Sequence, residues 1–555
     1  MLKGDRKKSE HRVVLLVVEA KKDYPMPADI KLLPSSLGRN AEATAVPTSP
    51  TEIERLIRVE VQALLSFAKD ESSPDPTFMA FERSLLARIQ ALGRLLIVLF
   101  LTVQEARLRK QMGARVEKAG RPFLRRPPQS RSLSTTLGIV RYSRTYYRAT
   151  DGSGFHPLDV ALGLTADRIT LAVLGLAARL ATLMSFAQAR VTLGWFLSSP
   201  PSTEVIEKTV LGLGRRTGEW FERVPAPAGD GEVLVVMIDS KGAPTATDTE
   251  LKRRRGKRKP NPHPESSRHR GRSRRTRYGK KPRRKKGDKS KNARMATLVV
   301  MYTLKHAADG TGRLLGPINR RVYASFAPKR HAFEIARREA NKRGFCEGSG
   351  KIIQIVTDGD DDLAVYAKQF FPEARHTVDV MHVIEYVYQA ASAIHREGSD
   401  ELAKWVKTQK SRLYGGREAA MVRDMKRHLD AIPITGPGNK GRRERLTQAI
   451  NYIDKRLPNM NYKALLDQDL ELGSGAVEGA VKNIIGARFD QGGSRWIRER
   501  AEALLQLRCM DKNGDFDAFI QWVHDDCRSS SLRDGQPVRV QQKVASPLPE
   551  LAEAA

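Results

Sequence analysis

Apolar residues recur at helical spacing in the first half of the chain. A stripe begins at Ile53 and a longer one runs from residue 85 to residue 108, so residues 51–118 are predicted to be helical. These helices are expected to pair with each other or with a second copy of the chain. Leucine-rich positions across residues 165–223 predict a further group of helices.

The pattern changes to that of buried strands after residue 230. Residues 233–238 are continuously apolar, as expected for a strand buried on both faces, and the run ends at Asp239. Further strands are predicted at residues 296–304, 321–326, 351–357 and 375–380, with helices at 329–343, 362–371 and 382–395. Three strands, a helix, a strand, a helix and a strand is the order of a ribonuclease H-like α/β core, a mixed five-stranded sheet flanked by helices.

These patterns divide the chain into segments. Residues 119–131 are rich in Arg and Pro and are interpreted as a linker. The predicted order is a disordered segment 1–50, an N-terminal helical region 51–127, a small β-hairpin 128–163, a helix-turn-helix-like region 164–223, a catalytic domain 231–525 with a basic insert 252–294 and a helical insertion 396–465, and a tail 526–555.

The region before the core contains two helices separated by a break. Pro200 and Pro201 end the first, Ser202 can cap the second, and the second is predicted over residues 203–216. A helix-turn-helix that binds the major groove and an ordinary helical hairpin explain this pattern equally well. In the first interpretation the phosphate contacts are Lys208, Arg215 and Arg216.

Charge points to a polyanionic partner. The 555 residues contain 97 Lys and Arg against 63 Asp and Glu, a net charge of +34, and nucleic acid is the leading candidate. Residues 252–294 hold 22 of the basic residues and are expected either to bind phosphates without regard to sequence or to be a solvated loop or localisation signal. The DNA contacts predicted there are Lys252, Arg253, Arg254, Arg255, Arg274, Arg275, Lys285 and Lys286.

Cysteine usage and hydropathy indicate the cell interior. Cys346, Cys509 and Cys527 are odd in number and far apart, which favours neither a disulfide framework nor a zinc site. The apolar run at residues 95–103 is shorter than the ~20 residues of a membrane span, so it is interpreted as packed protein, and no membrane partner is expected.

Three carboxylates occupy positions that suit metal-dependent chemistry. Asp239 and Asp358 each follow a predicted buried strand, and Glu478 lies in the first turn of a helix that Ser474 can cap. If strands one and four are neighbours, both aspartates emerge at one edge of the sheet, and the helix of Glu478 packs against it. Oxygen ligands alone suit Mg²⁺ or Mn²⁺, and two such ions would serve phosphodiester chemistry. Taken singly, the acids have plainer explanations: a turn at Asp358, a surface position for Asp239, and a helix-dipole contact for Glu478.

Several motifs add a family resemblance over residues 239–523. They are IDSKG at 238–242, the basic insert leading to ARMAT at 293–297, TDG at 357–359, DVMHVIEYVYQAA at 379–391, GSGAVEGAVKNIIGARFDQGGSRW at 473–496 and NGDFDAF at 513–519. In order, character and spacing they resemble the DDE transposases of ISKra-type bacterial insertion sequences. The resemblance implies that Asp239, Asp358 and Glu478 bind the metal ions, and that the protein is a bacterial, nucleoid-associated dimer or larger assembly acting on terminal inverted repeats and target DNA.

The resemblance also brings other residues near the site. It places Asp379 and His382 close to the triad, with the alternatives that Asp379 only orients a helix start and that His382 is a hydrogen-bonded core residue. Lys482 and Arg488 would reach DNA phosphates, or else are solvated side chains on a helix face. Relatives often carry a Cys-x-x-Cys after the Tyr-Tyr strand, and its replacement by RATDGSGFHPLDVALGL makes a zinc ion there doubtful. A catalytically silent DNA-binding descendant is the alternative function.

Overall fold

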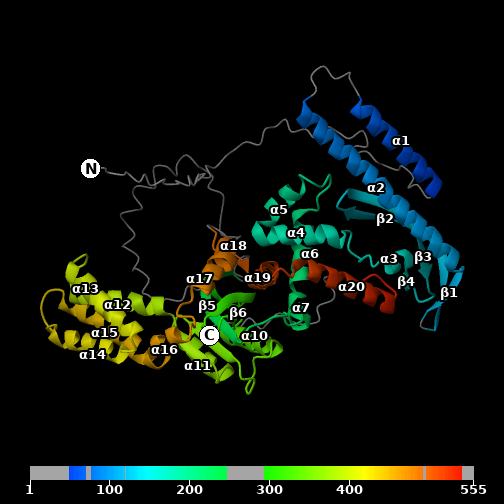
Figure 1. The fold of residues 1–555 in the computed structure, drawn as a ribbon. Coiled ribbons are helices and arrows are strands. Elements are labelled where there is room, and N and C mark those ends of the chain that lie inside the picture. Colours follow the sequence, from blue (N-terminus) through cyan, green and yellow to red (C-terminus); the bar gives the residue numbers. More distant parts are fainter. Residues whose placement is uncertain (1–48, 70–76, 119, 247–292, 492–495, 541–555) are drawn as a thin grey trace, which may run out of the picture.

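Two β-sheets organise the residues that this computed structural model describes, which are 49–69, 77–118, 120–246, 293–491 and 496–540. The larger sheet is formed from residues 233 to 497, and the smaller one lies near the N-terminal helices (Figure 1). The protein is therefore a mixed α/β structure with a mixed sheet and many helices. The predicted disordered segment 1–50 falls almost wholly outside the described residues.

The larger sheet contains the five predicted strands. They are β5 (Val233–Ala246), β6 (Ala293–His306), β7 (Leu314–Ser325), β8 (Ile352–Thr357) and β9 (Arg375–Val378), in the spatial order β7-β6-β5-β8-β9. The first three pair antiparallel, while β8 and β9 run parallel to β5. The expected adjacency of strands one and four is confirmed, because β5 pairs with β8. A short strand that the sequence did not predict, β10 (Trp496–Ile497), pairs with the end of β5.

Helices cover both faces of this sheet. Leu234, Val236 and Ile238 share one core with α10 (Lys329–Lys342) and α11 (Asp361–Phe370), which the sequence predicted within a residue or two. Val233, Val235 and Met237 point to the opposite core, formed with α12 (Val380–Ile394), α17 (Gly475–Ala480) and α19 (Arg498–Lys512). This alternation follows from the two-residue period of a strand, and the absence of polar positions in residues 233–238 follows from burial on both faces.

The smaller sheet corrects the predicted boundaries near the N-terminus. It consists of β1 (Arg115–Lys118), β2 (Arg121–Thr135), β3 (Gly138–Arg148) and β4 (Gly154–Phe155), so the helical region ends at Gln111 and not at residue 127. The Arg- and Pro-rich stretch that was interpreted as a linker is part of β2. Two of its three prolines, residues 127 and 128, fall where the β2–β3 register shifts, a place where no ladder hydrogen bond is needed.

Seven helices precede the larger sheet among the described residues. They are α1 (Pro50–Ala68), α2 (Phe78–Gln111), α3 (Pro157–Ala161), α4 (Leu171–Leu183), α5 (Phe186–Leu193), α6 (Thr203–Gly214) and α7 (Thr217–Arg223). Ser202 caps α6 as predicted, accepting a hydrogen bond from the Val205 N–H at 3.3 Å. Nine residues separate α5 from α6, against the three or four of a helix-turn-helix, and α6 buries Ile206 and Val210 in the core. The helical hairpin is therefore the better description.

Two predictions about the C-terminal part can be compared with the structure. The helical insertion is present as α13 (Asp400–Tyr414), α14 (Glu418–Ala431), α15 (Asn439–Arg456) and α16 (Tyr462–Asp467), which extend to one side of the sheet (Figure 1). The tail predicted from residue 526 is wrong at its start, because α20 (Phe516–Asp534) continues through it. Cys527 is buried there, and Asp526 accepts a hydrogen bond at 2.6 Å from the fully buried Arg216.

A buried ion pair closes the start of β5. Both carboxylate oxygens of Asp230 accept hydrogen bonds from Arg343, at 2.6 and 2.9 Å, and the Arg343 side chain is 0% exposed. Burial alone would raise the pKa of Asp230, but the hydrogen bonds from Arg343 and Asn319 outweigh it and lower that pKa. The stabilisation is therefore present above the unfolded-state pKa of about 4 and is lost as the pH falls below it.

Asp230→Asn should lower the free energy of unfolding by about 3 kcal/mol at pH 7, because it leaves the Arg343 guanidinium buried without its counter-charge. Urea denaturation followed by circular dichroism measures the effect. Asp309→Asn, at an exposed turn, is the matched control and should change the free energy of unfolding by less than about 0.5 kcal/mol. A loss for Asp230→Asn as small as the control's would contradict the assignment.

Candidate metal-binding site

Three aspartates stand at equivalent positions on three neighbouring strands. In the parallel register Ile238 pairs with Thr357, and Thr357 pairs with Val378. The next residue in each case is an acid: Asp239, Asp358 and Asp379. Asp239 continues the alternation of Val235 and Met237, so it lies on the sheet face that α12 and α17 cover. The structure thus brings the two predicted strand-end acids to one edge, together with Asp379.

Glu478 reaches the same edge from α17. One ligand atom each of Glu478, Asp379 and His382 lie within 4.8 Å of one another, close enough to share an ion. The helix of Glu478 is only six residues long and continues directly as a π-helical segment, Val481–Gly486. Such segments are rare and often occur at functional sites. Lys482 lies 3.5 Å from the Glu478 carboxylate, but this pair is exposed and contributes little to stability.

Asp379 is the most buried acid of the group and makes three contacts. Its carboxylate accepts hydrogen bonds from the Met381 N–H at 2.7 Å, from His382 Nδ1 at 3.2 Å and from the Ser474 hydroxyl. The first contact caps α12, as the plainer interpretation of Asp379 expected. Ser474, predicted to cap the helix of Glu478, makes no capping bond and instead ties that helix start to Asp379.

The charges of this cluster shift two pKa values in the expected directions. Burial raises the pKa of Asp239, and the negative charges of Asp358 and Glu478 raise it further. The hydrogen bond to Asp379, opposed by burial, raises the pKa of His382 to about 9. At neutral pH this contact favours the imidazolium form of His382, whose proton a metal ion would have to displace before the ring nitrogen could bind it.

The repulsion between these carboxylates means that this edge of the sheet needs a compensating positive charge. Asp239, Asp358 and Glu478 provide oxygen donors only, and the field of the last two disfavours ionisation of the first. The imidazolium of His382 offsets part of this charge, and its own partner is Asp379. A hard divalent cation such as Mg²⁺ fits this donor set, whereas Zn²⁺ would favour nitrogen or sulfur ligands.

The turn after β8 is held by residues that the sequence did not single out. The Tyr452 hydroxyl donates to the carbonyl of Asp358 at 2.8 Å, and Arg456 Nε donates to the carbonyl of Gly359 at 2.7 Å. Both come from α15 of the helical insertion, and Tyr452 stacks on Tyr386 of α12. Their only sequence signal is their helical spacing of four residues, which does not identify the turn they contact.

A buried arginine likewise supports the π-helical segment. Arg508 of α19 is 5% exposed and donates to the carbonyl oxygens of Ile484, at 2.8 Å, and of Asn483. It satisfies backbone groups of the segment that follows Glu478. Arg488, predicted as a DNA contact, is also structural: it is 3% exposed and donates to the Ala181 carbonyl at 3.1 Å. That prediction is wrong because the helix turns the arginine toward α4 and Trp496.

Four of the other predicted DNA contacts lie among the described residues. Lys208, Arg215 and Lys482 are exposed, whereas Arg216 is buried against Asp526 and Trp522 and cannot contact a phosphate. The remaining contacts lie in the basic insert, outside the described residues: Lys252, Arg253, Arg254, Arg255, Arg274, Arg275, Lys285 and Lys286.

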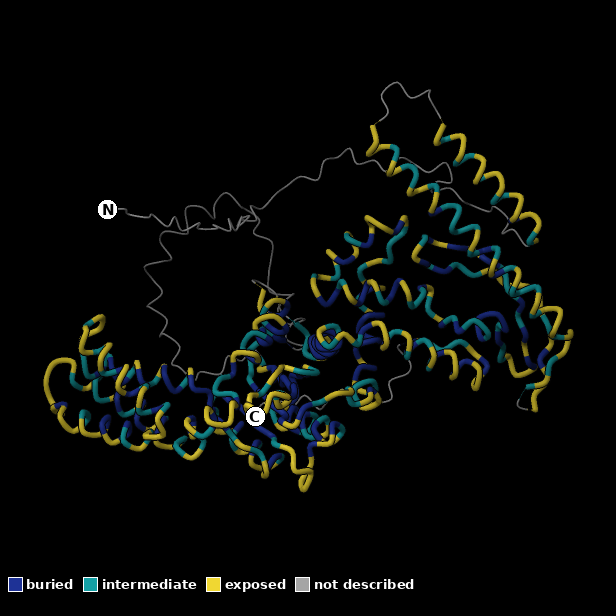
Figure 2. Tube along the Cα trace, viewed as in Figure 1, coloured by how far each residue is buried: buried dark blue, intermediate teal, exposed yellow. Residues whose placement is uncertain are grey.

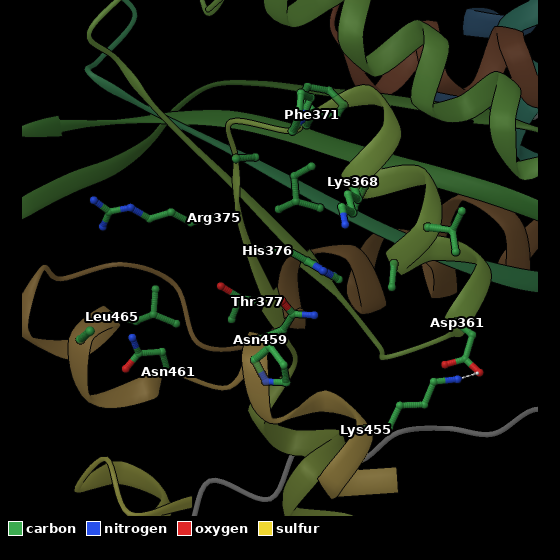
Figure 3. A pocket seen from close by; sticks show the side chains of 18 of the residues that line it. Asp361, Lys368, Phe371, Arg375, His376, Thr377, Lys455, Asn459, Asn461 and Leu465 are labelled. Carbon is green, nitrogen blue, oxygen red and sulfur yellow. Dashed lines mark hydrogen bonds and ion pairs between the residues drawn. The ribbon is translucent and has the colours of Figure 1, made fainter.

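A separate cavity of about 1000 Å³ lies beside the edge strand β9. Its wall includes Arg375, His376 and Asn461, and Asp361 at its rim pairs with Lys455 at 2.8 Å (Figure 3). None of Asp239, Asp358, Asp379 or Glu478 lines it. This cavity is therefore distinct from the acidic cluster.

Comparison with known proteins finds a distant structural similarity. No family model matches the chain, and no curated protein matches it. Among solved structures, the Drosophila P element transposase strand transfer complex is similar over 62% of this chain and 93% of that chain, with 11% identity and a TM-score of 0.30.

Asp379→Asn should lower the pKa of His382 from about 9 toward the ordinary 6.5, because it removes the acceptor that stabilises the imidazolium. Nuclear magnetic resonance of chain labelled with ¹³C at histidine follows the titration. His376, whose pKa burial lowers to about 4, is the internal control and should not move. An unchanged His382 titration would contradict the Asp379–His382 contact.

Proposed function

We propose that the chain is a DDE transposase of the ISKra type, with a ribonuclease H-like catalytic domain. The observations that carry the proposal are that Asp239 and Asp358 directly follow a register pair of the neighbouring strands β5 and β8, and that the negative charge of Glu478 acts on Asp239. The carboxylate of Glu478 itself lies within 4.8 Å of ligand atoms of Asp379 and His382. The strand order β7-β6-β5-β8-β9, with the first three strands antiparallel and the last two parallel, supports the ribonuclease H-like assignment. The motif resemblance at residues 238–242, 357–359 and 473–496 supports the family.

The acidic cluster suits the hydrolysis and transfer of phosphodiesters. Asp239, Asp358 and Glu478 would hold two Mg²⁺ or Mn²⁺ ions. Bound there, the ions would activate a water or a 3′-hydroxyl and stabilise the leaving oxygen. Asp379 orients His382 by a hydrogen bond at 3.2 Å, and the resulting positive charge lies beside the Glu478 carboxylate. Ser474 and Arg508 hold the start and the continuation of the Glu478 helix.

The rest of the chain fits a DNA substrate. A net charge of +34 favours a phosphate backbone, and the exposed Lys208, Arg215 and Lys482 are available for it within the described residues. We assign the terminal inverted repeats of the element and a target duplex as the substrates, and the bacterial nucleoid as the location. The basic residues of segment 252–294 would add sequence-independent affinity.

Glu478→Gln should keep the affinity for DNA and lose strand cleavage and strand transfer, because it removes one carboxylate charge from the metal site and no phosphate contact. The substrate is a labelled duplex carrying the inverted repeats that flank the gene. Binding is measured by fluorescence anisotropy, and cleavage and joining by gel electrophoresis in Mg²⁺ or Mn²⁺.

The controls separate the two functional interpretations. Glu499→Gln, at an exposed acid in the first turn of α19, should retain wild-type cleavage. Cleavage by Glu478→Gln at the wild-type rate would refute the triad. Binding without cleavage by the wild-type chain would establish the catalytically silent DNA-binding protein instead.

A further inference from the structure

The long helix α2 presents an apolar stripe to solvent. Its exposed apolar side chains are between 44% and 52% accessible, at Leu86, Ile89, Leu96, Phe100 and Val103. With Gly93 they are spaced by three, four, three, four and three residues, the spacing of a coiled-coil seam. The other sides of α2 are already used, because they pack on α1, on β3 and on α3. Figure 2 shows this hairpin of α1 and α2 at the edge of the molecule.

Position 93 is filled by a neighbouring element. A side chain on Gly93 would come within 2.5 Å of Leu137 Cδ1, so Leu137, from the turn between β2 and β3, lies in the space that this side chain would take. The stripe is therefore apolar along its length, over the ~26 Å of helix between Leu86 and Val103.

The stripe is complementary to itself when reversed. About a two-fold axis between residues 94 and 95, Leu86 faces Val103 of a second copy, Ile89 faces Phe100, and Leu96 faces position 93, where Leu137 takes the place of a side chain. The same operation sets Glu82 opposite Arg107 at both ends. Each of these two charged residues is exposed, and neither forms an ion pair with another described residue.

A membrane is the competing partner for such a helix. By length and composition α2 could cross a bilayer, and 17% of its most apolar window is buried. Its polar side chains, however, are committed to the folded chain: Gln90 donates to the Phe196 carbonyl at 2.6 Å, Arg94 donates to the Leu137 carbonyl at 3.0 Å, and Glu105 accepts from the Thr145 N–H at 2.7 Å. A helix that holds these contacts has one face free, which suits one partner helix and not surrounding lipid.

We propose that α2 pairs antiparallel with α2 of a second copy, with Leu86 packed on Val103 and Glu82 paired with Arg107 across a two-fold axis. The interface is isologous, so it closes at a dimer. The two α1 helices would flank the pair and form a four-helix arrangement. This inference does not depend on the catalytic assignment, since α2 contributes no residue to the acidic cluster.

Light scattering coupled to size-exclusion chromatography should give twice the 62.0 kDa chain mass for the full chain. Phe100→Glu should yield the monomer, because it places two charges in the seam, and its exposure of 52% means that the chain's own core does not need the ring. A monomeric wild type at tens of micromolar would overturn the proposal. Flotation of the wild type with phosphatidylcholine vesicles would overturn it in favour of the membrane.

Charge exchange tests the antiparallel register. Glu82→Arg and Arg107→Glu should each raise the dimer dissociation constant about tenfold, because two pairs become repulsive, and the double variant should return to within about twofold of wild type. Arg109→Glu, exposed but off the stripe, is the matched control and should have no effect. A double variant as weak as the single ones would exclude this register.

Cysteine cross-linking gives the direction independently. In a Cys346→Ser background, Leu86→Cys combined with Val103→Cys should form a disulfide-linked dimer on mild oxidation, because the two positions face each other. Leu86→Cys alone should not cross-link, since its two copies would lie about 25 Å apart along the axis. Cross-linking by Leu86→Cys alone would show a parallel pair and overturn the proposal.

Discussion

The parallel pairing of β5 with β8 is the constraint on which the rest of the site depends. Its register places Ile238 beside Thr357, so Asp239 and Asp358 emerge together where the strands end. Both strands are buried on two faces, and a shift of one residue would move every side chain to the opposite core. The hydrophobic packing of the sheet therefore fixes the separation of two carboxylates that repel each other. The packing of the sheet interior stabilises the fold, and this stabilisation offsets the repulsion between the acids at the edge.

Polar contacts then hold the elements that approach this edge. Asp379 links β9, α12 and the start of α17 through its bonds to Met381, His382 and Ser474. Arg508 satisfies carbonyl groups of the π-helical segment after Glu478. These buried groups have few alternatives to their partners, because an unpaired polar group in the interior costs more than the bond contributes. These contacts position the acids that follow β8 and β9 and the helix that carries Glu478.

The helical insertion and the N-terminal hairpin play different parts. The insertion contacts the site through Tyr452 and Arg456, which hold the backbone of the turn after β8. The hairpin of α1 and α2 lies away from the larger sheet (Figure 2), and α2 leaves an apolar stripe uncovered. The helical insertion therefore stabilises the geometry of the acids within one chain, whereas the hairpin offers the surface that we propose joins two chains.

The sequence by itself determined the strands of the larger sheet and the helices between them, because continuous apolar runs and helical stripes are local signals. It also determined which acids follow those strands. The features that depend on contacts between residues far apart in the sequence were decided only by the tertiary structure. Arg488 and Arg216 are basic in the sequence but buried in the fold, the Pro-rich stretch became β2 through pairing with β3, and Ser474 bonds Asp379 across 95 residues instead of capping its helix. Composition records what a side chain can do, whereas its neighbours in space decide which of those contacts it makes.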